Sequence, residues 1–272
     1  MNTRPPALIL HATGTNRDRE AAWACELAGA APEIVHVNQL CAGERRLADY
    51  RMLVLPGGFS YGDDLGAGKL WAVTLRYRLG DDLAAFIAAG RPVLGICNGF
   101  QALVKAGLLP GVRDQNGDDR LTPGSCSLAP DFTLARNASA RFECRWVYLA
   151  PQPNSPCVFT RGLTEPIYCP VAHGEGRFVA RDARALADLE AAGLVALRYV
   201  GPGGAAAPYP WNPNGSQNDI AGICNPQGTI LGLMPHPEDH IIEEQHPRYH
   251  HGERGMAGLA LFRNGVRYAA EL

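Results

Sequence analysis

The chain has 272 residues, of which 46% are hydrophobic and 19% are charged, and its formal net charge is −2 at pH 7. This length can bury a sizeable core, and we expect one domain over residues 1–272. A nearly neutral chain gives no electrostatic reason to expect a nucleic acid partner. No stretch approaches the roughly 20 apolar residues of a membrane span, so we expect no contact with a membrane.

Eight cysteines are scattered along the chain without a Cys-x-x-Cys pair, and the N-terminus lacks the apolar core and cleavage site of a signal peptide. Both features predict a cytoplasmic protein with reduced thiols. Six cysteines are most simply interpreted as buried apolar residues: Cys25, Cys126, Cys144, Cys157, Cys169 and Cys224.

Short apolar runs alternate with amphipathic stretches in the first hundred residues, which is typical of βαβ units around a parallel sheet. We expect strands at residues 7–10, 33–37, 52–55 and 92–96, and a helix at 18–28. A second helix is expected to end at residue 89, with Asp81 or Asp82 as its N-cap and Gly90 just beyond its end.

Apolar and polar residues alternate at residues 131–149 and 167–179, which predicts antiparallel strands that extend the same sheet. A helix near residues 182–192 and strands around 195–200, 220–224 and 229–234 complete the expected core. Residues 201–215, rich in Gly, Ala and Pro, predict a loop long enough to have a function.

The strongest chemical signal is Gly95-Ile96-Cys97-Asn98-Gly99, where an apolar strand ends at a cysteine and a helix begins at once. This is the pattern of a nucleophile elbow, a sharp turn that lifts one side chain out of the sheet. The glycines leave room for the turn, and the helix N-terminus favours thiolate over thiol. Taken alone, the motif fits a buried structural cysteine equally well.

A second motif, Met234-Pro235-His236-Pro237-Glu238, follows another apolar strand. Its prolines are expected to hold the chain extended, so that residues two apart point the same way. A cysteine nucleophile needs an imidazole to move its proton and a carboxylate to orient that imidazole. We therefore expect Cys97, His236 and Glu238 to form a catalytic triad; without Cys97, His236 would more simply cap a strand.

A glycine-rich turn, Gly57-Gly58-Phe59, directly follows the strand at 52–55. We expect it beside Cys97, where its backbone N–H groups and that of Asn98 would stabilise an oxyanion by several kcal/mol. A phosphate cradle is the rival interpretation. It is disfavoured because the turn does not read Gly-x-Gly-x-x-Gly, and Gly68-Lys69-Leu70 lacks the Ser/Thr and the earlier glycine of a P-loop.

These three segments, with Val171-Ala172-His173-Gly174-Glu175-Gly176-Arg177-Phe178 and Asn212-Pro213-Asn214-Gly215-Ser216, resemble the class I glutamine amidotransferases. More narrowly they resemble the glutaminase subunits of phosphoribosylformylglycinamidine synthases, which act in purine synthesis, and the motifs span nearly the whole chain. The resemblance implies one flavodoxin-like α/β domain, a three-layer sandwich whose mostly parallel sheet is extended by antiparallel strands. It places the site at the carboxyl edge of that sheet.

The resemblance also implies residue roles. Cys97 would form a γ-glutamyl thioester, His236 would act as acid and base, and Glu238 would orient His236. Residues implied to bind glutamine or the oxyanion are Gly57, Gly58, Phe59, Asn98, Gln101, His173, Gly174 and Glu175. For Arg177 and Asn214, a direct role, a contact with the synthetase and a purely structural role all stay open.

Glutamine is the implied substrate, and the implied partners are a large ATP-using synthetase subunit and a small accessory subunit. ATP and Mg²⁺ would bind the synthetase, which would use the ammonia to make formylglycinamidine ribonucleotide, and this chain would carry no metal or cofactor. The alternatives are a different synthetase, a hydrolase that acts without a partner, and a non-catalytic sensing subunit. The complete triad argues against the last of these, and the His-x-Glu motif against the hydrolase.

Two departures from the family pattern concern the C-terminus. Many relatives carry an arginine where this chain has Asp239, which leaves the contact of that side chain open. An extended tail is expected from about residue 239, and it holds His240, His246, His250 and His251. Histidines four apart can bind zinc, but the intervening prolines and Arg248 favour an irregular surface segment.

Overall fold

A computed structural model describes residues 4–111, 131–255 and 257–272 of the chain. Its main sheet has nine strands in the order β2-β1-β3-β4-β11-β10-β9-β6-β7. Their bounds, in that order, are Ala31–His36, Pro6–His11, Met52–Leu55, Val93–Ile96, Ile230–Leu233, Ile220–Cys224, Val195–Val200, Glu143–Pro151 and Ile167–His173. Neighbours from β2 to β11 pair in parallel, whereas those from β11 to β7 pair antiparallel. The predicted mostly parallel sheet with an antiparallel extension is confirmed.

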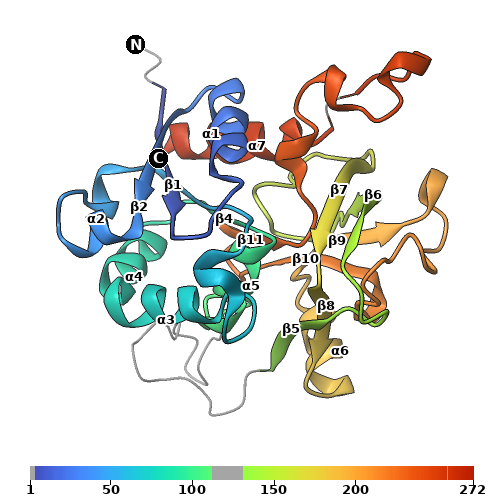
Figure 1. The fold of residues 1–272 in the computed structure, drawn as a ribbon, viewed down its shortest axis with the longest axis horizontal. Helices are drawn as coiled ribbons and strands as arrows, with labels where there is room; N and C mark the ends of the chain where they lie inside the picture. The colour runs from blue at the N-terminus through green and yellow to red at the C-terminus, as the bar shows by residue number, and fades with distance from the viewer. Residues whose placement is uncertain (1–3, 112–130, 256) are drawn as a thin grey trace.

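The helices lie in two layers around this sheet, as Figure 1 shows. On one side α1 and α7 pack together, and on the other side α5 packs on β4 and β11 with α3 and α4 beside it. The helices are α1 Asp18–Leu27, α2 Val37–Cys41, α3 Lys69–Arg78, α4 Gly80–Ala88, α5 Asn98–Lys105, α6 Ala183–Ala191 and α7 Leu259–Glu271. Strands β3 and β4 are buried throughout, because helices cover both of their faces. The three-layer α/β architecture is therefore confirmed.

Two of the expected antiparallel segments do not join the main sheet. Strands β5 (Phe132–Arg136) and β8 (Glu175–Ala180) pair with each other in a separate two-stranded sheet. The chain leaves the main sheet at Gly174, directly after β7, and Phe178 instead stacks on Phe132 with ring centroids 5.4 Å apart. Alternation predicted a strand with one buried face correctly, but it does not say which partner covers that face.

Helix α4 ends as expected and begins differently. Gly90 has φ +71° just beyond its end, the left-handed conformation that glycine adopts at no steric cost. At the start the N-cap residue is Leu79, and no side chain caps the helix, so the predicted cap by Asp81 or Asp82 is wrong. Both aspartates lie in the first turn, where the helix dipole favours negative charge.

The segment after Glu238 is less exposed than expected. His240 is only 1% exposed, and its Nδ1 lies 2.5 Å from the Tyr168 carbonyl oxygen, so the surface interpretation is wrong for this residue. The chain then forms short turns and ends in α7, whose apolar side packs against α1 and β3. The helix was not predicted from the sequence.

One cysteine also differs from expectation. Cys144 is exposed, because it points away from the core in the alternating strand β6, whereas Cys25, Cys157, Cys169 and Cys224 are buried as predicted. Cys126 lies outside the described residues. Among those residues, no helix combines the length and apolar character needed to cross a membrane.

Candidate active site

Three adjacent parallel strands, β3, β4 and β11, end at the same edge of the sheet, and each is followed by one of the three motifs. Gly57 follows β3, Cys97 follows β4 and His236 follows β11. Ligands in open α/β sheets bind at this carboxyl edge. The structure thus brings Gly57 and His236, which are 179 positions apart in the sequence, to a single site.

Cys97 occupies a strained turn between β4 and α5. Its φ of 50° and ψ of −104° are rare for a residue with a side chain, so the surrounding structure must impose them. Both flanking glycines are required by packing: a Cβ on Gly95 would lie 2.4 Å from Leu103 Cδ1, and one on Gly99 would lie 2.0 Å from the Leu55 carbonyl oxygen. The predicted nucleophile elbow is confirmed in its geometry.

His236 and Glu238 form a buried pair in which Nδ1 of the imidazole lies 2.7 Å from Oε1 of the carboxylate. The side chains are 3% and 0% exposed. This pairing was predicted, but the expected extended chain is wrong, because Pro237–Asp239 form a 3₁₀ turn. The carboxylate holds the proton of His236 on Nδ1, which leaves Nε2 without a partner among the described residues and available to a reacting group.

The charges of this pair and of Cys97 are coupled. Burial disfavours a charged imidazole, but the negative charges of Glu238 and Cys97 outweigh burial, and the pKa of His236 is raised well above its ordinary value. A histidine that keeps its proton at neutral pH stabilises a neighbouring thiolate. The arrangement can therefore hold Cys97 as a nucleophile and supply a proton to a leaving group.

Gly57 lies between Cys97 and His236. A Cβ at this position would be 2.6 Å from His236 Cε1 and 3.4 Å from Cys97 Cβ, and the first distance is shorter than real Cβ contacts allow. Any side chain would therefore have to displace the imidazole or the turn.

Gly57→Ala is accordingly expected to lower the kcat/KM for glutamine by about 100-fold, because small misplacements of reacting groups have effects of that size. Steady-state kinetics would measure it. Gly255→Ala is the matched control, because its Cβ would meet only His240, at an ordinary 3.5 Å. Equal activity of the two variants would contradict the placement of Gly57.

The expected oxyanion turn lies beside Cys97, but its three residues are not equivalent. The Phe59 N–H donates to the Gly14 carbonyl at 3.1 Å and is not free, while its ring is 47% exposed and stacks on Phe142. Gly58 has φ +142°, and a Cβ there would lie 2.7 Å from the Asn16 nitrogen. Within the described residues neither the Gly58 N–H nor the helix-terminal Asn98 N–H meets an acceptor, so the expected role of these two groups as oxyanion donors stays a prediction that the geometry allows.

Asn98, Gln101 and Glu175 meet in one hydrogen-bonded cluster, as predicted. The Asn98 amide donates to Gln101 Oε1 at 3.1 Å and to Asp63 Oδ1 at 2.9 Å, and the Gln101 amide donates to the Glu175 carbonyl. Burial and the charge of Glu175 raise the pKa of Asp63, and burial lowers the pKa of the nearby Lys105. Asp63 and Lys105 were not predicted as site residues. They add one carboxylate and one ammonium group beside the cluster of Asn98, Gln101 and Glu175.

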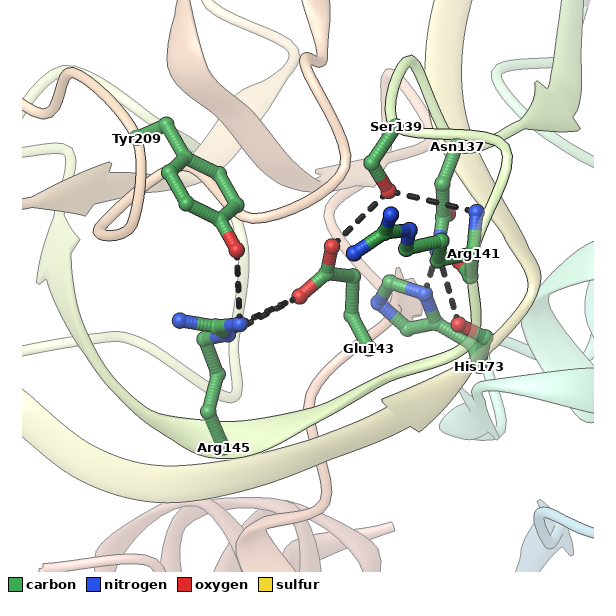
Figure 2. A network of polar contacts seen from close by, with 7 residues as sticks. All are labelled: Asn137, Ser139, Arg141, Glu143, Arg145, His173 and Tyr209. Atoms are coloured by element: carbon green, nitrogen blue, oxygen red, sulfur yellow. Dashed lines mark hydrogen bonds and ion pairs between the residues drawn. The ribbon is translucent and has the colours of Figure 1, made fainter.

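His173 is a buried support and not a second base. Its pKa is lowered to about 3 by burial and by the positive charge of His236, so the ring is neutral. Asn137 donates to the His173 carbonyl at 2.8 Å and to the Gly174 carbonyl through its backbone at 3.0 Å, as Figure 2 shows in part. The neutral ring and these bonds fix the turn that leads into Glu175.

Figure 2 shows that a polar network continues from this turn to the long loop at 201–215. Glu143, 3% exposed, accepts from Ser139 at 2.8 Å and from Arg145 at 2.7 Å. Arg145 in turn donates to the Tyr209 hydroxyl at 2.9 Å and lies 4.9 Å above that ring. The loop is thus tied to β6, the strand that pairs with β7 up to His173. A functional role for the loop stays a prediction.

Asn214 has a structural role in this region. It is fully buried and donates to the Gly176 carbonyl at 2.9 Å and to the Tyr199 hydroxyl at 3.1 Å, with His173 Nε2 at 3.5 Å. These bonds hold the strand that follows the His173 turn. Nothing in the structure assigns Arg177 a partner in catalysis.

Comparisons with known proteins agree with this geometry. The family model for a CobB/CobQ-like glutamine amidotransferase domain matches residues 4–269. A Treponema denticola protein named phosphoribosylformylglycinamidine synthase subunit PurQ is 49% identical over 97% of this chain and 99% of its own. A Dehalococcoides mccartyi protein of the same name is 44% identical over 97% of this chain and 98% of its own.

Among solved structures, a chain from a structure of PurLQS of Thermotoga maritima is 32% identical, with a TM-score of 0.70, and the match covers 98% of this chain and 99% of that one. A Thermotoga maritima glutamine amidotransferase at 16% identity, with a TM-score of 0.55, shows the shared fold alone. The chain belongs to the class I glutamine amidotransferases, in the CobB/CobQ-like family.

Proposed function

We propose that this chain is the glutaminase subunit of a phosphoribosylformylglycinamidine synthase. It hydrolyses glutamine to glutamate and ammonia and passes the ammonia to an ATP-dependent synthetase subunit. The observation that carries the proposal is the strained Cys97 elbow beside the buried His236–Glu238 pair. The two relatives named for this synthase, 49% and 44% identical over nearly the whole chain, support the choice of synthetase.

In the first half of the reaction the Cys97 thiolate attacks the side-chain amide carbon of glutamine. The carbonyl oxygen becomes an oxyanion, which the N–H groups of Gly58 and Asn98 stabilise. His236 then gives the proton on Nε2 to the amide nitrogen, the carbon–nitrogen bond breaks, and ammonia leaves behind a γ-glutamyl thioester. Glu238 keeps the imidazole oriented while its charge changes.

In the second half, His236 takes a proton from a water molecule, and the resulting hydroxide attacks the thioester carbon. The same two N–H groups stabilise the second oxyanion, the carbon–sulfur bond breaks, and glutamate leaves with the thiolate restored. In the proposed complex Asp63 and Glu175, the carboxylates beside the cluster formed by Asn98 and Gln101, receive the α-ammonium group of glutamine, and their negative charges support this assignment.

The partner is the large synthetase subunit, which binds ATP and Mg²⁺, with a small accessory subunit in the same complex. We place the complex in the cytoplasm. The loop at 201–215, tied to β6 through Tyr209 and Arg145, borders the pocket or the partner. A different synthetase partner is the alternative, and the experiment below separates the two.

The test combines covalent labelling with glutamate release. A diazoketone analogue of glutamine is expected to label Cys97 alone among the eight cysteines, as peptide mass spectrometry would show. Glutamate release is expected to rise when the synthetase, its ribonucleotide substrate and ATP are added. Labelling at another cysteine would overturn the glutaminase assignment, whereas Cys97 labelling without a response to that partner would favour the alternative synthetase.

A further inference from the structure

The loop between β1 and α1 contacts both the expected oxyanion turn, Gly57-Gly58-Phe59, and the segment that carries the His236–Glu238 pair. This loop is bonded to the oxyanion turn at several points: Phe59 N–H donates to the Gly14 carbonyl at 3.1 Å, Tyr61 N–H donates to the Thr13 carbonyl at 2.6 Å, and Thr15 Oγ1 lies 3.0 Å from Ser60 Oγ. The oxyanion turn therefore moves with this loop and not only with β3.

Arg17, the last residue before α1, makes the bond that matters for the oxyanion donor. Its backbone N–H donates to the Gly57 carbonyl at 3.3 Å. In a planar trans peptide the carbonyl of one residue and the N–H of the next point in opposite directions. A Gly57 carbonyl held toward Arg17 consequently turns the Gly58 N–H away from the loop, and Gly57 itself lies beside Cys97, where a Cβ would be 3.4 Å from Cys97 Cβ.

The side chain of the same residue reaches the segment that carries the His236–Glu238 pair. Arg17 Nη1 lies 3.3 Å from Asp239 Oδ1 and 3.7 Å from Glu20 Oε1. Asp239 closes the 3₁₀ turn that carries Glu238, and its own N–H donates to the His236 carbonyl at 3.2 Å. The turn also lies against α1, β7 and α7, and the ion pair with Arg17 adds a polar contact next to the start of α1.

We propose that Arg17 is a positioning residue for glutamine hydrolysis, which joins the oxyanion donor to the His236–Glu238 pair through its ion pair with Asp239. The proposal rests on the glutaminase function given above. The guanidinium touches neither substrate nor Cys97; it sets the distance between the donor that receives the oxyanion and the imidazole that moves the proton.

The ion pair has a defined pH range. Burial and the charge of Glu238 raise the pKa of Asp239 to about 6, although His236 and Arg17 oppose the rise, and Glu20 adds to it. The charge of Asp239 also contributes to the raised pKa of Cys169 on β7, after burial and the charge of Glu238. Below pH 6 Asp239 is protonated and the ion pair is lost. Because the pKa is raised from its ordinary value of 3.8, protonation of Asp239 favours the folded state, and this contribution to stability is lost as the pH rises from 3.8 to about 6.

The decisive variants are Arg17→Ala and Asp239→Asn, assayed as glutamate release by the assembled complex at pH 8. Each is expected to lower kcat by about tenfold with little change in KM, because no glutamine contact is removed. The double variant is expected to be no worse than either single variant, since both remove one interaction. Arg17→Asp combined with Asp239→Arg is expected to recover most of the activity.

Two readouts separate positioning from a structural role. Asp239→Asn should have an unchanged or higher melting temperature, and the wild-type fall in kcat below pH 6 should be absent from it. Arg19→Asp is the matched control, because Arg19 is exposed and its side chain pairs with no residue that the structure describes. Full activity of Asp239→Asn at pH 8, or a loss of activity that follows a loss of stability, would overturn the proposal.

Alkylation of Cys97 by iodoacetamide keeps this test independent of the glutaminase assignment. Its rate reports the Cys97 thiolate and needs no glutamine, and both single variants are expected to slow it several-fold through misplacement of His236. A wild-type protein that releases no glutamate would contradict the proposed function, whereas alkylation that is unchanged in both variants would contradict the role of Arg17.

Discussion

Cys97→Ala is expected to lower glutamate release by about 10⁴-fold or more, because the covalent thioester route is lost and only the smaller acceleration from binding and the oxyanion donors remains. Folding should be unaffected, since alanine is smaller than cysteine and the contact of the cysteine sulfur with the Ala172 carbonyl, at 3.8 Å, is weak. Glutamate release and a thermal melt on the same preparation measure both effects.

The matched control for this variant is Cys144→Ala, which removes an exposed thiol on β6. It should retain wild-type activity and wild-type labelling of Cys97 by the diazoketone analogue. Substantial glutamate release by Cys97→Ala would mean that another group forms the covalent intermediate, and the whole arrangement of the site would have to be reassigned.

The second large effect is expected for Glu238→Gln, which keeps the shape of the side chain and removes its charge. We expect kcat to fall by about 10² to 10⁴-fold, because an amide can hold His236 in the wrong tautomer and cannot stabilise the imidazolium. Glu238 is fully buried, so no solvent compensates for the lost charge.

The pH dependence follows from the pKa of His236. In the wild type this pKa is raised, since Glu238 and Cys97 outweigh burial, and the protonated imidazole persists to high pH. In Glu238→Gln the charge that opposes burial is lost, so the pKa of His236 should fall. The alkaline limb of the kcat/KM profile should therefore move to lower pH. Stability contributed by the protonated histidine is present at low pH and is lost as pH rises through that pKa. Glu244→Gln, at an exposed residue, is the matched control and should leave the profile unchanged. An alkaline limb that does not move in Glu238→Gln would contradict the influence of Glu238 on His236.

The sequence was most informative where chemistry and local geometry coincide. The elbow at Cys97 could be predicted because a strand, a cysteine and a helix meet within a few residues. The flanking positions need glycine, since a Cβ at either would clash with neighbouring atoms. The position of the glycine turn beside Cys97 and the His236–Glu238 pair could be predicted for the same reason, although the pair is set by a 3₁₀ turn and not by the extended chain expected from the prolines.

Residues that act through distant partners were missed. Asp63 and Lys105 flank the predicted pocket residues, but nothing local marks a carboxylate or an ammonium group that becomes buried only when α3, α5 and the His173 turn come together. Phe59 was assigned to the oxyanion turn because it follows two glycines; its N–H is taken by Gly14, 45 positions earlier in the chain.

By itself the sequence predicted most strands of the main sheet and the elbow at Cys97, because these depend on residue type and on spacing within a few positions, and its motifs carried the resemblance to the family. Only the tertiary structure decided that β5 and β8 form their own sheet, that the Phe59 N–H is occupied, and that Arg17 meets Asp239 across 222 positions. Burial and long-range pairing depend on how layers pack, and a local pattern of apolar and polar residues does not contain that information.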